Sequence, residues 1–491
     1  MNLEILKRSQ LKRNIIIGVV AVLIISAIIL NFTRAKYRTT QSIPLVNGTI
    51  NYSASDLNIV AITVDGESYD TIPEGNYELT EESYCTINGE KAEITFSWNS
   101  ATKNLTISPF TAKGTKCYLD FKKSNSLFDV LLNDNPTRLT RNDFSNPFET
   151  ENTGTLYTVG APWIEEFDNS LDTVYYFAGN ALKNWVKFGK DSNNNDLYWR
   201  IIRTNEDGSI KMLYSGIDPN TTSGYINPSS SFNPSRSNPM YAGYMYGPSG
   251  SLTDNRTNTT NSIIKGEIDN WYSNGLNIKT DSNGNKYDDY ISKTATYCND
   301  RAYDGTYATN REFIFPGYNR LIDNNQPSFK CGNQASGIPF NTADIADKFS
   351  VSTTNNGNGN LTYPIALMTA DEIVFAGGVF NQNSKAWYYY NASGESITGT
   401  NWWWTMTPEW YMASYTAFII AYMFSVQGTN NPGQLDDNYV NLDYDELINN
   451  ANVSIRPAIS LKSCVEWTAG NGSSSNPYEV NINSTCANAE N

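Results

Sequence analysis

The last third of the chain holds three punctuated blocks that constrain the fold more than any other feature. The first block, Leu361–Gly378, predicts a short helix, because Thr369 and Glu372 form a capping box and a glycine follows the helix. The second block, Asn401–Tyr411, is rich in aromatic residues and is typical of a strand. The third block, Asn452–Lys462, predicts a strand that closes the module.

This order of elements, together with a strand at Trp199–Arg203, resembles a group of exported bacterial surface proteins. Their C-terminal module is similar to a divergent C-type-lectin-like fold, of the subgroup that includes formylglycine-generating sulfatase modifiers. The resemblance covers roughly residues 165–482. It implies a fold that mostly displays a variable binding face and only occasionally catalyses.

The resemblance also implies how the module closes and which activities are absent. Its first and last strands lie together, so we expect Leu197–Arg203 and Ser454–Leu461 in one sheet. The paired active-site cysteines of the sulfatase modifiers have no match, because no cysteine lies between Cys331 and Cys464. The Glu-Pro-Asn, Gln-Pro-Asp and Trp-Asn-Asp triplets of calcium-dependent lectins are absent as well.

An apolar run near the N-terminus predicts export. Residues 15–30 would span about 24 Å as a helix, at ~1.5 Å per residue, and four basic residues precede the run. We interpret it as an uncleaved signal anchor with the N-terminus inside the cell, so residues 1–36 form a cytoplasmic tail and transmembrane helix. The alternative is a signal peptide cleaved near Thr33–Ala35, which would release a secreted protein.

The charge of the chain excludes one class of partner. The net charge is −15, and residues 1–38 carry seven Lys/Arg against one Glu, or +6, so the remainder carries −15 − 6 = −21. Such a body repels phosphate backbones, and we expect no nucleic-acid partner.

Six cysteines and the lack of histidine bear on chemistry. Six cysteines allow 15 pairings, and we expect the sequential one in an exported chain. A reducing compartment would instead leave all six free. Without histidine, Ser-His-Asp and Cys-His catalysis and His-ligated metals are excluded. The expected bridges are Cys85–Cys117, Cys298–Cys331 and Cys464–Cys486.

The whole sequence predicts a mainly β chain with a few short helices, of the α+β class. After the anchor we expect a small β-sandwich spacer at 37–123, a linker at 124–164 and the C-type-lectin-like display module at 165–491. Asn88–Gly89 and Asp207–Gly208 predict tight hairpins, and Ser262 predicts a helix N-cap.

Aromatic residues of the last third are the candidate ligand-binding face. Tyrosine supplies rigid contact area, and the asparagine-rich surroundings supply adaptable hydrogen bonds. Three consecutive tryptophans, at 402–404, are interpreted as a core strand, with a stacking platform as the alternative. The candidates for an exposed face are Tyr388, Tyr389, Tyr390, Trp410, Tyr411 and Tyr415.

An acidic stretch before the closing strand is the one candidate metal site. Calcium prefers six to eight oxygen ligands, which Asp436, Asp437, Asp443 and Asp445 could help to supply. The alternative is a solvated loop, and we expect no other cofactor.

Arg456 stands between Ile455 and Pro457 in the apolar closing strand, so we expect it to be buried. A buried guanidinium needs acceptors, and the first turn of the capped helix offers Asp371 and Glu372. These features predict a structural ion pair between Arg456 and one of the two carboxylates.

Together these features predict a membrane-anchored surface protein that binds a glycan or a protein outside the cell and is not an enzyme. The alternatives are a cell-wall glycan hydrolase that uses paired carboxylates, and a purely architectural envelope protein.

Overall fold

The protein is described by a computed structural model, in which the chain divides into two compact units, Met1–Lys123 and Ser124–Asn491. The described residues are 58–71, 77–99, 104–108, 114–167, 170–235, 239–248, 257–301, 312–332, 347–352, 359–413, 419–439 and 452–488. In this described part, no helix is long and apolar enough to span a membrane. The expected anchor at residues 15–30 lies outside it.

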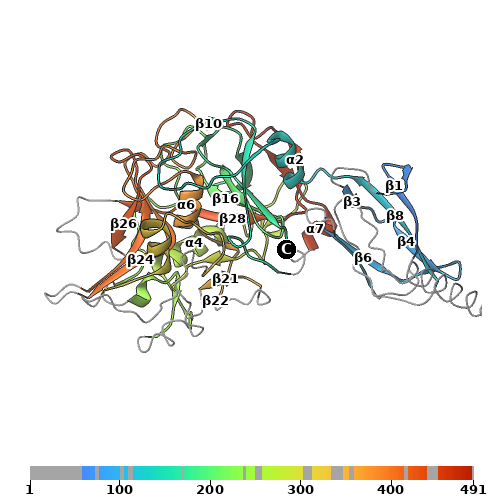
Figure 1. The fold of residues 1–491 in the computed structure, drawn as a ribbon, viewed down its shortest axis with the longest axis horizontal. Coiled ribbons are helices and arrows are strands. Elements are labelled where there is room, and N and C mark those ends of the chain that lie inside the picture. The colour runs from blue at the N-terminus through green and yellow to red at the C-terminus, as the bar shows by residue number, and fades with distance from the viewer. Residues whose placement is uncertain are drawn as a thin grey trace, which may run out of the picture. The chain divides into compact units, whose positions relative to one another are not determined.

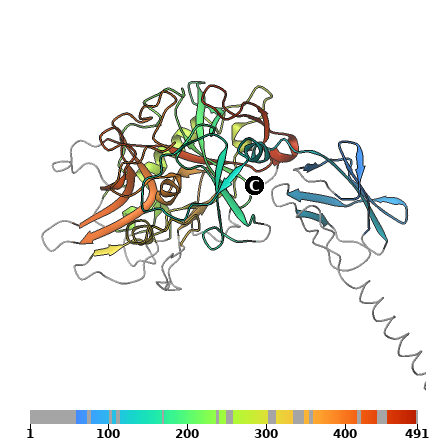
Figure 2. The same cartoon turned by 45° about the horizontal axis from the view of Figure 1, so that its top comes forward.

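The described part of the first unit contains a mixed sheet and a separate two-stranded sheet, coloured blue in Figures 1 and 2. The sheet has the order β2-β1-β8-β4-β5, and β3 also pairs with β8. β6 and β7 form the antiparallel hairpin, and Leu105 of β7 shares a core with Ile62 and Phe121 of the sheet. The strands are β1 Asn58–Val64, β2 Glu67–Tyr69, β3 Tyr77–Leu79, β4 Tyr84–Ile87, β5 Glu90–Ala92, β6 Thr95–Asn99, β7 Asn104–Ser108 and β8 Thr115–Lys123.

The predicted turn at Asn88–Gly89 is confirmed. It joins β4 to β5, and both residues have positive φ, of 54° and 88°, as a tight two-residue hairpin turn requires. Cys85 on β4 lies directly opposite Cys117 on β8, and the two form a disulfide with a Cα–Cα distance of 4.0 Å.

The second unit is organised by an eight-stranded sheet. Its order is β23-β28-β16-β15-β12-β11-β9, with β14 paired to β15. Its neighbouring strands β16 and β28 are labelled in Figure 1. The strands are β9 Thr137–Leu139, β11 Thr155–Gly160, β12 Thr173–Tyr176, β14 Trp185–Lys190, β15 Asp196–Thr204, β16 Ile210–Tyr214, β23 Ile365–Leu367 and β28 Pro457–Leu461.

The expected closure of the module is confirmed at the level of the sheet. β15 and β28 lie in the same sheet, but β16 lies between them, so they are not direct neighbours. The predicted hairpin at Asp207–Gly208 supplies this intervening strand, because it joins β15 to β16. Ser454 belongs to another strand, β27 (Val453–Ser454), in a different sheet.

A second sheet carries the aromatic block. It has the order β20-β24-β25-β26, with β27 paired to β24. Its strands are β20 Glu312–Ile314, β24 Trp402–Ala413, β25 Ile419–Val426 and β26 Leu435–Tyr439. Smaller sheets are formed by β19 Tyr297–Cys298, β21 Lys348–Ser350 and β22 Gly359–Asn360; by β10 Glu151–Asn152 and β13 Asn180–Ala181; by β17 Met245–Tyr246 and β18 Thr260–Asn261; and by β29 Glu466–Ala469 and β30 Glu479–Asn481.

The helices of the second unit are short, and two of them begin at the predicted caps. Ser262 accepts a hydrogen bond from the Lys265 amide, and Thr369 and Glu372 form both bonds of a capping box. The helices are α2 Leu127–Asp134, α4 Ile263–Asn274, α5 Pro316–Tyr318, α6 Ala370–Ala376 and α7 Ser484–Asn488, with single-turn helices η1 Pro239–Ala242, η2 Tyr287–Tyr290 and η3 Asn319–Asp323.

The segment 124–164 is part of the second unit. The linker predicted at 124–164 is wrong, because this segment belongs to the second unit and supplies α2, β9 and β11. Its Asn-Pro breaks resemble a linker, yet β11 adds a strand to the large sheet.

The three predicted disulfides are confirmed, with Cys298–Cys331 and Cys464–Cys486 at Cα–Cα distances of 5.5 and 5.7 Å.

Candidate functional site

The aromatic residues predicted to form an exposed face are mostly buried. Tyr388 is fully buried, and its hydroxyl donates to the carbonyls of Ser384 and Gly433. Tyr389 and Tyr411 are also buried. The prediction is therefore wrong for these three, because the polar tip of Tyr388 finds partners inside the fold, as buried tyrosine hydroxyls usually do.

The remaining aromatic candidates offer little free surface. Tyr390 and Trp410 are half-buried, and the Trp410 ring stacks on Tyr422 at 4.7 Å. Tyr415 lies outside the described residues. Of the three consecutive tryptophans, the second and third are buried and the first is half-buried, which agrees with a core strand.

Two of the four candidate carboxylates of the acidic stretch lie among the described residues. Asp436 and Asp437 lie on β26 and are half-buried, whereas Asp443 and Asp445 fall outside the described residues. Within the part of the chain that the structure describes, no group of three or more acidic, cysteine or histidine side chains is placed to hold a metal ion.

A carboxyl pair lies next to this stretch. Glu409 of β24 is 2% exposed, and its Oε2 has no hydrogen-bond partner. Burial, and then the charge of Asp437, hold the pKa of Glu409 well above its usual range. Burial and the charge of Asp436 also raise the pKa of Asp437. Burial and a neighbouring carboxylate therefore disfavour the charged form of each carboxyl.

This pair does not suit the mechanism of a glycoside hydrolase. Both carboxyl groups of such an enzyme must reach the glycosidic bond. Glu409 is 2% exposed, so its carboxyl group is not accessible to a substrate.

The pair predicts an unusual dependence of stability on pH. Because the folded-state pKa of Glu409 is raised, its favourable contribution is complete below the ordinary glutamate pKa and is lost as the pH rises through the folded value. Glu409→Gln mimics the protonated form. We expect this variant to exceed the wild type in unfolding free energy at pH 8 by roughly 1–3 kcal/mol and to match it near pH 4.

Urea unfolding of both proteins between pH 4 and pH 8 measures this difference. Glu395→Gln is the control, because Glu395 is exposed and its substitution should leave the profile unchanged. A wild type that is at least as stable as Glu409→Gln at pH 8 would contradict the raised pKa of Glu409.

Arg456 is fully buried, as predicted, but the predicted ion pair is wrong. Its guanidinium donates to the carbonyls of Tyr214 and Tyr388 and to the Ser215 hydroxyl, at 3.1, 2.8 and 3.4 Å. It also lies 4.7 Å from the centre of the Trp403 ring. Backbone carbonyls and an aromatic face thus take the place of the expected carboxylate, and burial lowers the pKa of Arg456 to about 9.

The two carboxylates of α6 are paired with other cations. Lys211 of β16 donates to both oxygens of Glu372, at 2.7 and 2.9 Å, and Arg203 of β15 donates to one of them at 3.1 Å. Arg320 of η3 binds Asp371 through two parallel bonds of 2.9 and 3.0 Å. With Glu206 and Asp300, which pair with Arg203 and Arg320, these residues form a network that we name the charge cluster.

The charge cluster surrounds a small cavity. The cavity has a volume of about 20 Å³, room for roughly one water molecule. Asp300 is 1% exposed, has a positive φ of 47°, and its Oδ1 has no hydrogen-bond partner. Burial raises the pKa of Asp300. A cavity of this volume is too small for a ligand larger than a water molecule.

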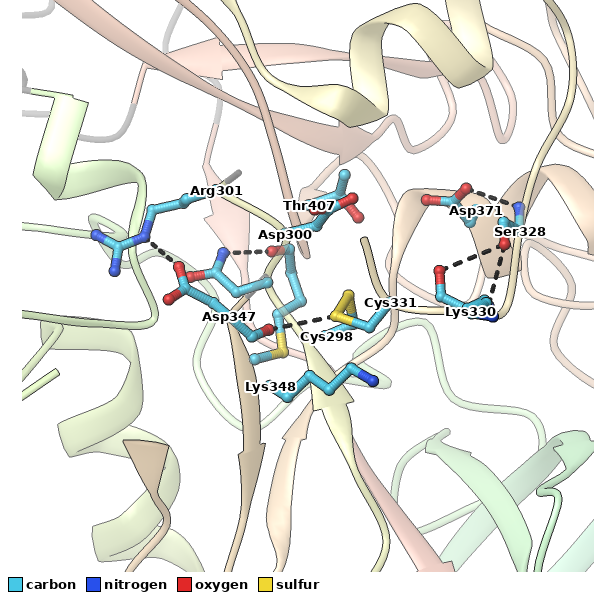
Figure 3. Close-up of a disulfide and its surroundings, with 12 residues drawn as sticks. Cys298, Asp300, Arg301, Ser328, Lys330, Cys331, Asp347, Lys348, Asp371 and Thr407 are labelled. Atoms are coloured by element: carbon cyan, nitrogen blue, oxygen red, sulfur yellow. Dashed lines mark hydrogen bonds and ion pairs between the residues drawn. A yellow bond between two sulfur atoms is a disulfide. The ribbon is translucent and has the colours of Figure 1, made fainter. Parts of the chain in front are cut away.

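The disulfide Cys298–Cys331, drawn in Figure 3, has both cysteines in the lining of the same cavity. The amide of Cys331 donates to Glu165, and its sulfur lies 3.4 Å from the Asp347 carbonyl oxygen. Asp347 in turn pairs with Arg301. The bridge thereby ties β19 to the segment that follows η3.

A groove of about 460 Å³ lies beside the charge cluster, within the size range of small-molecule sites. Its lining combines aromatic rings, side-chain amides and hydroxyls. Phe144 and Trp163 are half-buried, and Asn142 and Gln326 are exposed. The described lining residues are Thr140, Arg141, Asn142, Phe144, Thr158, Val159, Gly160, Ala161, Trp163, Thr173, Asn325, Gln326, Pro327 and Phe375.

The groove and the charge cluster share their walls. Helix α6 carries Asp371 and Glu372 at its start and Phe375 near its end, so one helix serves both sites. The segment 325–331 lines the groove with its first residues and the cavity with its last. Trp163 lines the groove, and its carbonyl accepts the amides of Phe329 and Lys330. Buried ion pairs therefore hold the groove walls in place.

The sequence analysis did not predict the groove. Arg141, Asn142 and Phe144 fall in the segment interpreted as a linker, and Asn325 and Gln326 follow a helix that has no capping motif. One available signal was Arg138 and Arg141, two cations three residues apart in an acidic chain.

Comparisons with protein-family models, with curated proteins and with solved structures found no match to this chain.

Proposed function

We propose that this protein is an exported, membrane-anchored surface protein that binds a glycan non-covalently in the groove. The observation that carries the proposal is the meeting of Phe144 and Trp163 with the amides of Asn142, Asn325 and Gln326 in one cavity of suitable size. Aromatic faces pack against the C–H faces of sugar rings, and amides offer both donors and acceptors to sugar hydroxyls.

Other features support the location and the fold in this proposal. Three disulfides with no free cysteine among the described residues are typical of an oxidising, extracellular compartment. The apolar run at 15–30 would anchor the chain with its N-terminus inside, and the first unit would serve as a spacer. The resemblance to C-type-lectin-like modules favours binding over catalysis, and we retain it as part of the proposal.

A glycan array probed with the full chain tests the proposal. The chain is solubilised in a polyoxyethylene detergent, because sugar-based detergents would compete for the groove. We expect binding to a defined set of glycans and its loss in Trp163→Ala. Trp467→Ala is the matched control, because Trp467 is also half-buried but lies on β29, outside the groove lining.

Two outcomes would contradict the proposal. One is a wild-type protein that binds no glycan, particularly if it binds surface proteins on a parallel array. The other is glycan binding that Trp163→Ala leaves intact while the variant remains folded by near-ultraviolet circular dichroism.

A further inference from the structure

Among the described lining residues of the groove, one is a cation, and its position is fixed by the fold. Arg141 is half-buried, and its Nη1 donates to the carbonyls of Phe375 and Val374 in the last turn of α6, at 2.6 and 3.3 Å. The Val374 carbonyl also accepts the amide of Gly377. Its guanidinium carbon lies 4.7 Å from the centre of the Phe144 ring and 4.6 Å from that of Phe148. Two carbonyls and two rings therefore hold the guanidinium in place.

The other edge of this guanidinium has no protein acceptor among the described residues. Among the described residues, neither Nε nor Nη2 of Arg141 makes a hydrogen bond, and no carboxylate forms an ion pair with it. Asp143 contributes only a weak attraction, and its carboxylate accepts the amide and hydroxyl of Ser145. Burial lowers the pKa of Arg141, so its charge is partly desolvated without a compensating anion.

The distribution of charge around the groove also favours an anionic ligand. The chain carries 50 Asp and Glu residues and a net charge of −15. The described lining of the groove nevertheless contains one arginine and no carboxylate. A negatively charged group is therefore attracted to this site and repelled by most of the remaining surface.

We infer that the groove recognises a carboxylate, and that the glycan it takes is an acidic one built from uronic-acid-type sugars. This inference rests on the proposed function. Nε–H and the adjacent Nη2–H form a planar fork that matches the two oxygens of a carboxylate. The amides and hydroxyls of the lining then hold the sugar ring, and Trp163 and Phe144 supply its apolar contacts.

Varying the ligand gives the sharpest test, because the protein itself is left unchanged. The full chain is titrated with oligogalacturonate, with its methyl ester and with the neutral galactose oligomer of equal length. We expect oligogalacturonate to bind at least about 10-fold more tightly than both neutral probes, a difference of about 1.4 kcal/mol. A sulfated galactose oligomer is the further arm, since a sulfate can also pair with arginine; tighter binding of this probe would overturn the choice of carboxylate.

Variants of the protein test whether Arg141 causes the preference for the acidic glycan. Arg141→Gln should remove the preference for the acid over the ester, and Arg141→Lys should restore it only in part, because lysine lacks the fork. Arg138→Gln is the matched control. Arg138 likewise donates to a helix-end carbonyl, that of Leu132, and lies over the Tyr175 ring, but it is outside the groove lining.

The outcomes distinguish carboxylate recognition from the proposed glycan binding. Equal binding of acid, ester and neutral oligomer, all sensitive to Trp163→Ala, would overturn the carboxylate while the glycan-binding function stands. An acid preference that survives in a folded Arg141→Gln would also overturn it. Failure of every glycan probe would overturn both.

Discussion

Replacing Arg320 by alanine is expected to lower the unfolding free energy of the second unit by about 3–5 kcal/mol. Arg320 is buried and pairs with both Asp371 and Asp300. Burial alone would lower the pKa of Arg320, but the charges of these two carboxylates outweigh it and raise the pKa. Without the guanidinium, two buried carboxylates lose their partner, and the free energy of desolvating them is no longer offset.

Urea unfolding followed by near-ultraviolet circular dichroism measures this loss. Lys187→Ala is the control, because Lys187 pairs with Asp196 near the surface, where both side chains are about one-third exposed. Surface pairs contribute about 0–1 kcal/mol, so the control should change little. Similar losses for the two variants would mean that the charge cluster is not a special stabilising feature of this fold.

The double variant Cys298→Ser/Cys331→Ser is expected to lose about 3–4 kcal/mol, because this bridge closes a loop with a sequence separation of 33 residues. It should also weaken glycan binding. Cys331 ends the segment 325–331 that forms one wall of the groove, and without the bridge this wall is tied to β19 only by non-covalent contacts.

The variant Cys464→Ser/Cys486→Ser provides the comparison. Its bridge has a separation of 22 residues, and neither cysteine lines the groove. We expect a stability loss of about 3 kcal/mol by the same chain-entropy relation, with glycan affinity unchanged at temperatures where both variants are folded. If both double variants lose affinity equally, the effect is global and the Cys298–Cys331 bridge has no particular link to the groove.

Local sequence patterns predicted the features that depend on neighbouring residues. The capping box of Thr369 and Glu372 and the hairpin turn at Asp207–Gly208 are specified within a few residues, and both are present. Sequential pairing of the cysteines also held, because each bridge joins segments that the fold brings together over a short chain distance.

Features that depend on long-range packing could not be obtained this way. Burial of Arg456 was predictable from its apolar strand, but its partners were not. Lys211 on β16 and Arg203 on β15 pair with Glu372. The guanidinium of Arg456 donates to backbone carbonyls instead. The tyrosines near 388 were taken for a surface because tyrosine suits binding faces, although the same ring with a satisfied hydroxyl suits a core.

Hydrogen–deuterium exchange with and without bound glycan tests the location of the binding site most directly. The probe is the glycan that binds most tightly on the array. We predict slower amide exchange in residues 140–144, 158–163 and 325–327, the three segments that line most of the groove, and no change in β24. Protection confined to the aromatic strand β24 or to residues 388–390, with the three groove segments unchanged, would contradict binding in the groove.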